Sequence, residues 1–345
     1  MDTGNANTGS DSGVTRTLKA GRTAKIAGET SALKKKKRAK LKREIRAVAV
    51  FLAFSFPTIL GLLVFKYGMA FNSVIYSFFR YSQNDLANPP GPFVWFENYE
   101  RIFQSPIFWD QLKNTLILFV FGMAFGFFPP IVYTIFMSQI GRGQATLRYL
   151  RMLPGAIPGV AALAVWKYIY DSDFGILNTV VGFFDIPPQR WLEDPALVKF
   201  TLRFSGLLGG FNMLYLITIN NIPEEIYEAA RIDGASEFRC VFAITIPGMS
   251  TMIATQFLLS MSGALLAFQD VLVMTGQQGG PDGAASTLMM GVYNRMFTNI
   301  DYGSAMALAV IIVLLTCFFL LIRMYFARRL DDEGTGRRNK NRWKS

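Results

Sequence analysis

Six apolar runs, each about twenty residues long, constrain this chain more than any other feature. They cover residues 47–65, 116–137, 153–170, 202–219, 249–268 and 304–322. A helix of about 20 residues rises far enough to cross a hydrocarbon core of about 30 Å. A hydrophobic content of 51% and 31 Phe residues agree with this interpretation. The sequence therefore predicts an all-α integral membrane protein with six transmembrane helices.

Three of these runs are irregular. Pro129 and Pro130 predict a kink in the second run, because proline removes a helical hydrogen bond. Pro154 and Pro158 predict that the third run is broken. The fourth run is rich in glycine, and small residues allow helix backbones to approach closely.

The basic residues flank the apolar runs and indicate the orientation. Four segments lie on one side of a six-span topology, namely 1–46, 139–151, 220–247 and 323–345. Together they hold 26 of the 35 Lys and Arg residues. Basic loops remain in the cytoplasm. Both termini and the 223–247 segment are thus predicted to be cytoplasmic. The net charge of +11 does not indicate a nucleic-acid partner, because it lies in the tails and includes the polybasic stretch 34–43, which favours anionic lipid.

Several kinds of chemistry are absent from the sequence. There is no His, which removes the commonest general base and metal ligand. No Gly is followed by Lys, so the chain lacks a phosphate-binding loop of the G-x-x-x-x-G-K-[ST] type. Cys240 and Cys317 lie in different environments, and we expect two inert thiols. We therefore predict no enzyme activity, no catalytic or metal residues and no cofactor bound by this chain.

Residues 223–247 form a polar segment between the fourth and fifth apolar runs. Pro223 suits a first helical position, and Glu224 and Glu225 place negative charge at the positive end of the helix dipole. Glu228 and Arg231 share one helix face, three residues apart. Gly234 supplies a left-handed stop. The sequence predicts a short helix, a sharp turn at Gly234 and a second short helix from about Ser236. Such an element could receive motion from a partner and pass it to the spans that it joins.

The order of residues in this segment resembles the cytoplasmic loop of ABC importer permeases of the carbohydrate-uptake group. The matching positions there are Glu228–Ala229–Ala230, Asp233–Gly234–Ala235 and 244–247. Further similar positions, which extend the resemblance to about residues 48–328, are Asn98–Tyr99, Asn114–Thr115, Leu153–Pro154, Trp166–Lys167, 174–178, 191–195, 274–276, 279–281, Thr287–Leu288 and 302–305. Gln277–Gln278, Lys66–Tyr67–Gly68 and the long basic leader depart from the family pattern.

The resemblance implies a type I ABC importer permease fold and a set of partners. These are a second related permease subunit, two ATP-binding subunits that bind ATP and Mg, and an extracytoplasmic solute-binding protein. It also implies location in a bacterial or archaeal cytoplasmic membrane. By this likeness a coupling helix docks on the ATPase and includes Glu224, Glu225, Glu228, Ala229, Ala230, Arg231, Asp233 and Gly234.

The solute would be a sugar, oligosaccharide or polyol, and candidate pathway residues are polar or aromatic side chains within or at the end of the runs. Polar groups at membrane depth face a cavity or another helix. The candidates are Trp166, Asn212, Tyr215, Gln256, Ser260 and Gln269. Hydrogen bonding between helices is the alternative role for each. Arg203 is expected to reach the interface, and Asp270 is expected to be solvated.

The domain prediction has three parts: a disordered leader at 1–46, a six-helix permease domain at 47–328 with the coupling loop at 222–247, and a basic tail at 329–345. Two alternatives remain open. An ion-coupled secondary transporter would usually carry ionisable groups within its spans. A membrane scaffold without transport would leave the polar segment 223–247 unexplained.

Overall fold

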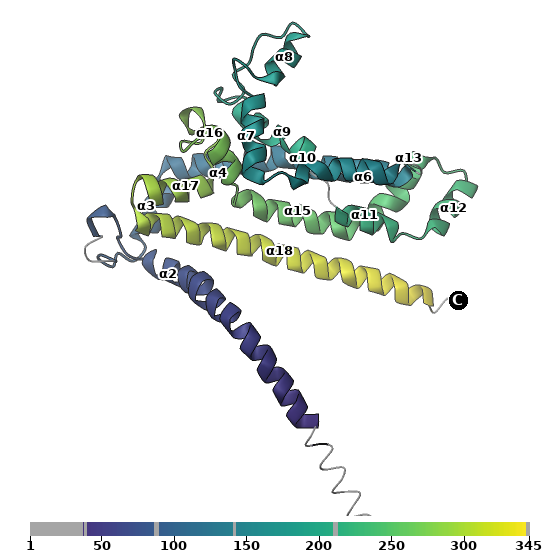
Figure 1. Cartoon of the computed structure of the whole chain (residues 1–345), viewed down its shortest axis with the longest axis horizontal. Helices are drawn as coiled ribbons and strands as arrows, with labels where there is room; N and C mark the ends of the chain where they lie inside the picture. The colour runs from purple at the N-terminus through teal and green to yellow at the C-terminus, as the bar shows by residue number, and fades with distance from the viewer. Residues whose placement is uncertain (1–36, 38–39, 86–89, 141–142, 210–212, 343–345) are drawn as a thin grey trace, which may run out of the picture. The chain divides into compact units, whose positions relative to one another are not determined.

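The computed structural model describes residues 37, 40–85, 90–140, 143–209 and 213–342 (Figure 1). Within these residues the chain is helical, and the only strand-like pairs are two isolated bridges, Phe79 with Phe93 and Ser82 with Asp301. The contacts divide the chain into two compact units, Met1–Phe71 and Asn72–Ser345. The predicted all-α fold is confirmed.

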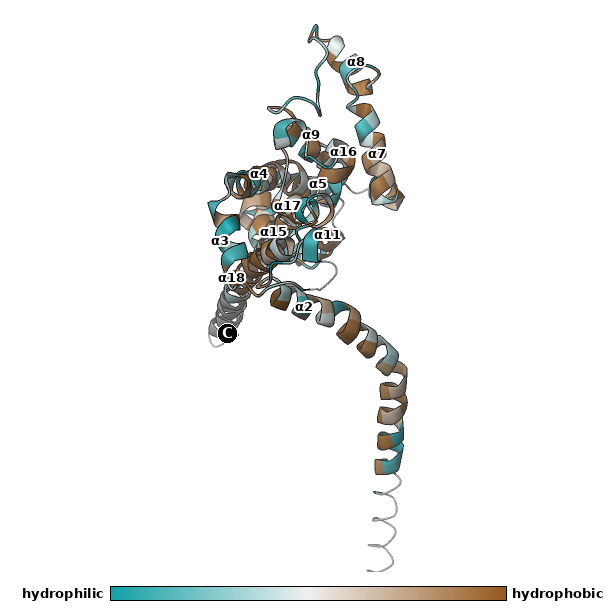
Figure 2. Ribbon diagram, turned by 90° about the vertical axis from the view of Figure 1, so that its left-hand side faces the viewer, coloured by the Kyte–Doolittle hydropathy of each residue, from teal (hydrophilic) through white to brown (hydrophobic). Residues whose placement is uncertain are grey.

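The first unit contributes most of a long helix, Lys40–Tyr76, which includes a π-helical turn η1 (Leu62–Gly68) and ends with α2 (Met69–Tyr76). Hydrophobic residues follow most of its length (Figure 2). It begins inside the segment assigned to the leader, and Lys40 and Glu44 lie one turn apart there. The rest of the predicted leader, apart from Lys37, lies outside the described residues.

In the second unit, the helix Pro106–Gln139 contains the predicted second span. It consists of α4 (Pro106–Gly122), a π-helical turn η3 (Met123–Phe127) and α5 (Phe128–Gln139). Pro129 and Pro130 lie in the first turn of α5. The wide turn that precedes them is a common way for a helix to continue past missing hydrogen-bond donors.

One hydrophobic cluster of this unit lies around α18 (Tyr302–Arg342). This helix runs beside α15 (Ser250–Leu265), as Figure 1 shows, and also contacts α3 (Glu97–Gln104) and α17 (Leu288–Tyr293). Buried residues at these contacts are Ile102, Phe108, Leu265, Leu288, Leu308 and Ile312. The apolar part of α18 that can span a membrane is Tyr302–Ile322.

Two other predicted spans are strongly bent. Helix α6 (Gln144–Met152) with the 3-10 turn η4 (Leu153–Ala156) meets α7 (Gly159–Ile169) at 93°, so the predicted break near Pro158 is confirmed. Segment Glu237–Gly248 meets α15 at 66°. This segment holds α13 (Glu237–Cys240), the π-helical turn η5 (Val241–Thr245) and α14 (Ile246–Gly248).

The predicted fourth span is divided among α9 (Val198–Phe204), α10 (Gly206–Gly209) and α11 (Met213–Asn220). Among the described residues, three helices are long and apolar enough to cross a membrane, or five if each bent pair counts as one span. The fourth run is not among them, and the count of six stays a prediction. A Cβ on Gly206 would lie 3.7 Å from the Cα of Gly126, which fits the predicted close approach of backbones.

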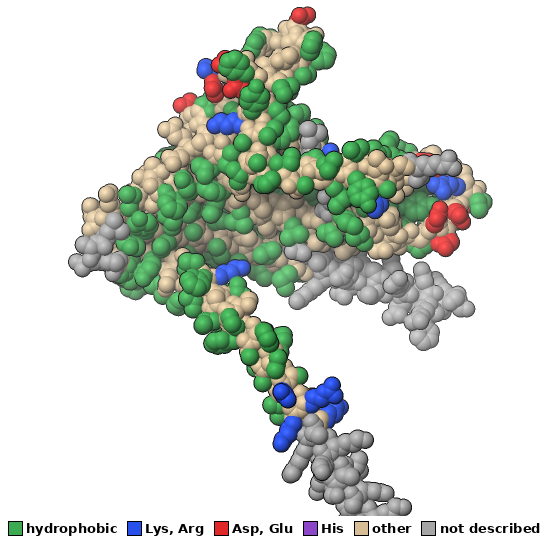
Figure 3. Space-filling view, viewed as in Figure 1, with side chains coloured by type: hydrophobic (Ala, Val, Ile, Leu, Met, Phe, Trp, Pro, Cys, Tyr) green, Lys and Arg blue, Asp and Glu red, His purple; other side chains and the backbone are tan. Residues whose placement is uncertain are grey.

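Short helices complete the polar connections. They are η2 (Gln83–Asp85), α8 (Ile176–Gly182), α12 (Glu224–Ile232), α16 (Gln269–Thr275), η6 (Pro281–Gly283) and η7 (Asn294–Thr298). On the visible face of the second unit, charged side chains gather over α12 and α13 and around α8, while hydrophobic side chains cover the helices between them (Figure 3).

Candidate functional site

The polar segment 223–247 folds as two short helices joined by a left-handed turn. Pro223 is the residue before α12 rather than its first residue, and Glu224 and Glu225 occupy the first turn. Gly234 has a φ of 80°, and its N–H donates to the carbonyl of Arg231 at 3.0 Å. The hydroxyl oxygen of Ser236 accepts from the N–H of Arg239 at the start of α13. The predicted helix, turn and second helix are confirmed.

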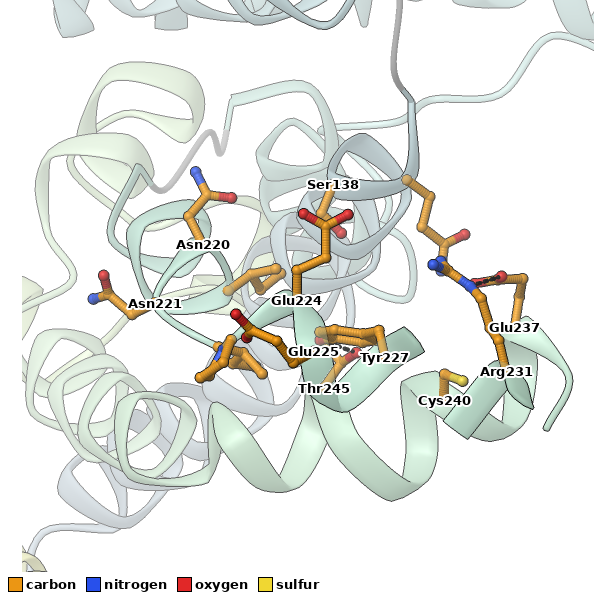
Figure 4. Close-up of a pocket in the computed structure, with 14 residues that line it drawn as sticks. Ser138, Asn220, Asn221, Glu224, Glu225, Tyr227, Arg231, Glu237, Cys240 and Thr245 are labelled. Carbon is orange, nitrogen blue, oxygen red and sulfur yellow. Dashed lines mark hydrogen bonds and ion pairs between the residues drawn. The ribbon is translucent and has the colours of Figure 1, made fainter. Parts of the chain in front are cut away.

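An ion pair links the two short helices. The Nε of Arg231 donates to an Oε1 of Glu237 at 2.9 Å (Figure 4). The hydrogen bond to Glu237 raises the pKa of Arg231 above its ordinary value. Glu228 and Arg231 lie three apart in α12, as the sequence predicted, and the turn at Gly234 brings Glu237 of α13 to Arg231 as its ion-pair partner.

A hydroxyl contact inside the polar segment joins its two halves. The hydroxyl groups of Tyr227 and Thr245 are 3.0 Å apart, and Thr245 and Cys240 are buried. A cavity of about 980 Å³ lies between the segment and the ends of α5 and α11, where Ser138, Gln139 and Asn220 line it (Figure 4). Because the Tyr227–Thr245 contact joins α12 to the turn η5, the segment can move as one body.

The outer side of the polar segment is apolar as well as charged. Ile232 is 87% exposed, Phe238 75% and Phe242 57%, and the two phenyl rings are 4.9 Å apart. The predicted coupling residues are exposed except for Ala230, which is half-buried. The exposed ones are Glu224, Glu225, Glu228, Ala229, Arg231, Asp233 and Gly234. The sequence prediction named the polar and small residues but missed this aromatic pair. The sequence feature that could have indicated the pair is the spacing of four residues between Phe238 and Phe242, which places them on one helix face.

Two predicted pathway residues lie in one cavity. Ser260 and Gln269 line a space of about 660 Å³ bounded by α4, α7, α9, α10, α15 and α16. Gln256 is half-buried on α15 and does not line this space. Asn212 lies outside the described residues.

The two predicted aromatic contacts lie elsewhere. Tyr215 is 2% exposed and belongs to a buried cluster with Met123, Phe127 and Met249. Its ring faces are covered, so the structure gives no support for stacking on a solute there. Trp166 is half-buried and stacks on Tyr170, with ring centroids 5.4 Å apart.

The expectation that Asp270 is solvated is wrong, and its partner is Arg203. The Nη1 of Arg203 donates to the Oδ2 of Asp270 at 2.8 Å, and the two side chains are only 21% and 23% exposed. Both line the cavity that holds Ser260 and Gln269. Sequence reasoning treated each residue separately as the end of its own span, and nothing local joins positions so far apart in the chain.

Several motif residues of the resemblance hold the backbone of the polar connections. The amide of Asn98 donates to the carbonyls of Ser77 and Phe79, and that of Asn114 donates to those of Gly283 and Ser286. Such bonds satisfy buried carbonyl groups. These side chains are therefore positioned to fix the fold rather than to contact a solute.

Comparison with known proteins identifies the family. The family described as "Binding-protein-dependent transport system inner membrane component" matches residues 26–332. The chain belongs to this family. As a member, it is a multi-pass membrane permease component of a transport system that depends on a binding protein, not a catalytic subunit. This agrees with the predictions of fold, membrane location and lack of enzyme activity, and it sets aside the ion-coupled transporter and the scaffold without transport.

Curated relatives and a solved structure are consistent with this permease family. The diacetylchitobiose uptake system permease protein NgcF of Streptomyces coelicolor is 29% identical over 72% of this chain and 74% of its own length. The lactose transport system permease protein LacF of Rhizobium radiobacter is 30% identical over 67% and 80%. A chain of a bacterial alginate ABC transporter, solved with an alginate pentasaccharide-bound periplasmic protein, has a TM-score of 0.72 at 20% identity over 84% of this chain and 97% of that chain. It shows the shared fold.

Proposed function

We propose that this chain forms half of the translocation pathway of an ATP-driven importer for a sugar, oligosaccharide or polyol. The observation that carries the proposal is the polar segment 223–247. It is a two-helix element, held together by the Tyr227–Thr245 contact and exposed on its outer side, between α11 and α15. In this role its outer side, with the exposed Phe238 and Phe242, meets a separate ATPase.

The partners of the proposed importer follow from this arrangement. A second related permease completes the pathway, and two ATP-binding subunits hydrolyse ATP with Mg. The chain lies in a bacterial or archaeal cytoplasmic membrane with both termini in the cytoplasm, which the excess of basic residues on that side supports. The proposed solute class is supported by the names of the relatives, which transport diacetylchitobiose and lactose.

The coupling role is tested by Gly234→Pro in the full importer. Proline cannot adopt a φ of 80° and has no N–H to donate to Arg231. Asparagine tolerates the left-handed region, so Gly234→Asn is the matched control. We expect Gly234→Pro to abolish ATP-dependent uptake and Gly234→Asn to retain most of it. A panel of neutral sugars that includes lactose and diacetylchitobiose is first tested on wild-type cells. The measurement is the rate at which each variant imports the sugar that the wild type imports.

Glu228→Lys reverses a charge on the exposed face of α12 and is expected to have the same effect as Gly234→Pro. Membrane insertion of every variant is measured by its amount in the membrane fraction. Wild-type uptake by both Gly234→Pro and Glu228→Lys, at equal amounts of inserted protein, would rule out the coupling role.

A further inference from the structure

The cavity that holds Ser260 and Gln269 has the size and lining of a small-molecule site. Its volume of about 660 Å³ lies within the range of ligand pockets in proteins. Aromatic side chains of Phe119, Phe127 and Phe268 line part of its wall. Small residues supply much of the rest, namely Gly122, Gly126, Gly159, Gly206, Gly263, Ala264 and Ala267.

A single ion pair supplies the charge of this wall. Arg203 comes from the last turn of α9 and Asp270 from the first turn of α16, and their contact is 2.8 Å long. Each side chain is about four-fifths buried, so solvent screens the pair weakly. With both groups ionised, the two charges cancel, and the lining residues of the cavity carry no net charge.

The pair also leaves hydrogen-bonding capacity unused. The Nε of Arg203 is buried and has no hydrogen-bond partner in the structure. A Cβ on Gly122 would lie 3.9 Å from the Cδ and 4.0 Å from the Nε of Arg203, so the glycine leaves space beside the guanidinium. A planar guanidinium with free N–H groups, next to a carboxylate and the amide of Gln269, suits hydroxyl groups as donors and acceptors.

We infer that the Arg203–Asp270 pair is the charge-selecting element of a water-filled solute site, which accepts neutral polyhydroxylated solutes and disfavours anionic ones. Each hydroxyl can donate to the carboxylate and accept from the guanidinium, while apolar ring faces cover the C–H surfaces of a sugar. An anionic solute would compete with Asp270 for Arg203 and bring the carboxylate close to a like charge. Among the related transporters, lactose is neutral and alginate is acidic, so the distinction separates known solute classes.

This inference rests on the proposed function but is tested without knowledge of the solute. Ser260 is half-buried on the cavity wall and is replaced by cysteine in a full importer whose permease chain has Cys240→Ala and Cys317→Ala. Two thiosulfonate reagents of similar size act as probes, one carrying a sulfonate and one a trimethylammonium group. The measurement is the ratio of their reaction rates with Ser260→Cys.

With the pair intact, we expect both reagents to react. Asp270→Asn removes the negative charge and should raise the sulfonate-to-ammonium ratio on the order of tenfold, the size expected for one unit charge in a partly solvated site. Arg203→Gln should lower the ratio by a similar factor. The double variant Arg203→Gln with Asp270→Asn has no charge at either position and should return the ratio to the starting value.

Ala196→Cys, on the exposed connection before α9, is the matched control, and its ratio should not change with any of these substitutions. Folding of each variant is checked by its elution as a single peak in gel filtration in detergent. If Asp270→Asn fails this check, Arg203→Gln carries the test alone, and a ratio at Ser260→Cys that it leaves unchanged overturns the inference.

Two results would overturn the inference: no reaction of Ser260→Cys with either reagent, or a ratio that neither single substitution changes. Both can occur in an importer that still takes up sugar and still loses uptake with Gly234→Pro. Conversely, the importer could show the expected reagent ratios at Ser260→Cys and transport no sugar. That result would contradict the proposed function but not the role of the Arg203–Asp270 pair.

Discussion

Gly276 and Gly279 have similar φ values but different surroundings. Their φ values are 76° and 75°, in the left-handed region that side chains disfavour. A Cβ on Gly279 would lie 2.6 Å from the Cα of Ser286, whereas nothing lies within 4 Å of one on Gly276. Gly279 is therefore required by both conformation and space, and Gly276 by conformation alone.

This difference predicts an order of stability for three alanine substitutions. Gly279→Ala should cost about 2 kcal/mol or more, because the strain of a positive φ adds to an overlap with the backbone. Gly276→Ala should cost about 1–3 kcal/mol from the strain alone, because its ψ of −173° places it in a region almost restricted to glycine. Gly182→Ala, at a helical glycine with nothing within 4 Å, should be neutral or slightly stabilising.

The measurement is the apparent melting temperature of the purified protein in detergent, which should fall most for Gly279→Ala and least for Gly182→Ala. Equal melting temperatures for Gly276→Ala and Gly279→Ala would contradict the close approach of Gly279 to Ser286.

Single residues were predictable where the reason for them is local. The left-handed turn at Gly234 and the cap at Ser236 follow from short-range backbone rules, and the structure has both. Arg203 and Asp270 were not predictable as a pair, because their contact depends on how α9 and α16 pack. The burial of Tyr215 was missed for the same reason, since a tyrosine in an apolar run fits a core as well as a cavity.

At the scale of elements, Asn178 organises the connection that surrounds α8. Its Nδ2 donates to the carbonyls of Ser172 and Gln189, each at 3.0 Å. Its Oδ1 accepts from the N–H of Gln189 at 3.0 Å and from the indole N–H of Trp191 at 2.8 Å. One side chain therefore joins both ends of a connection that has only one short helix of its own.

Asn178→Ala should loosen this connection without affecting the membrane helices. We expect the amide of Gln189 to exchange with deuterium roughly tenfold faster, because the loss of its acceptor costs about 1–1.5 kcal/mol. Thr179→Ala, at the exposed neighbouring position, is the matched control. The measurement is hydrogen exchange of the peptides that cover 186–194, and equal exchange in the two variants would refute the role of Asn178.

Helices were predictable from the sequence to the extent that proline, glycine and apolar length decide them. The break near Pro158 and the long helices at 106–139 and 302–322 agree with the apolar runs and their breakers. The bend of 66° before Ser250 was not predicted, because its angle depends on packing against neighbouring helices. The π-helical turn η3, which lies just before Pro129 and Pro130 in one continuous helix, was likewise not predicted.

At the scale of the whole molecule, the fourth run decides the topology. Residues 202–219 hold parts of α9, α10 and α11 and do not form one long helix among the described residues. If this run crosses the membrane, the chain has six spans, and the polar segment 223–247 lies on the side opposite the connection 171–197. If it does not, the two lie on the same side.

Two cysteines on either side of this run test the prediction of six spans. In the permease chain with Cys240→Ala and Cys317→Ala, Ala196→Cys and Ser236→Cys both lie at exposed positions. If 202–219 crosses the membrane, the excess of basic residues near the termini places Ala196 outside the cell and Ser236 inside it. A membrane-impermeant maleimide should then label Ala196→Cys in intact cells. It should label Ser236→Cys only after permeabilisation. Labelling of both after permeabilisation is the control for reactivity. Because no other run separates these positions, labelling of both in intact cells, or of neither, would mean that 202–219 does not cross and that the chain has at most five spans.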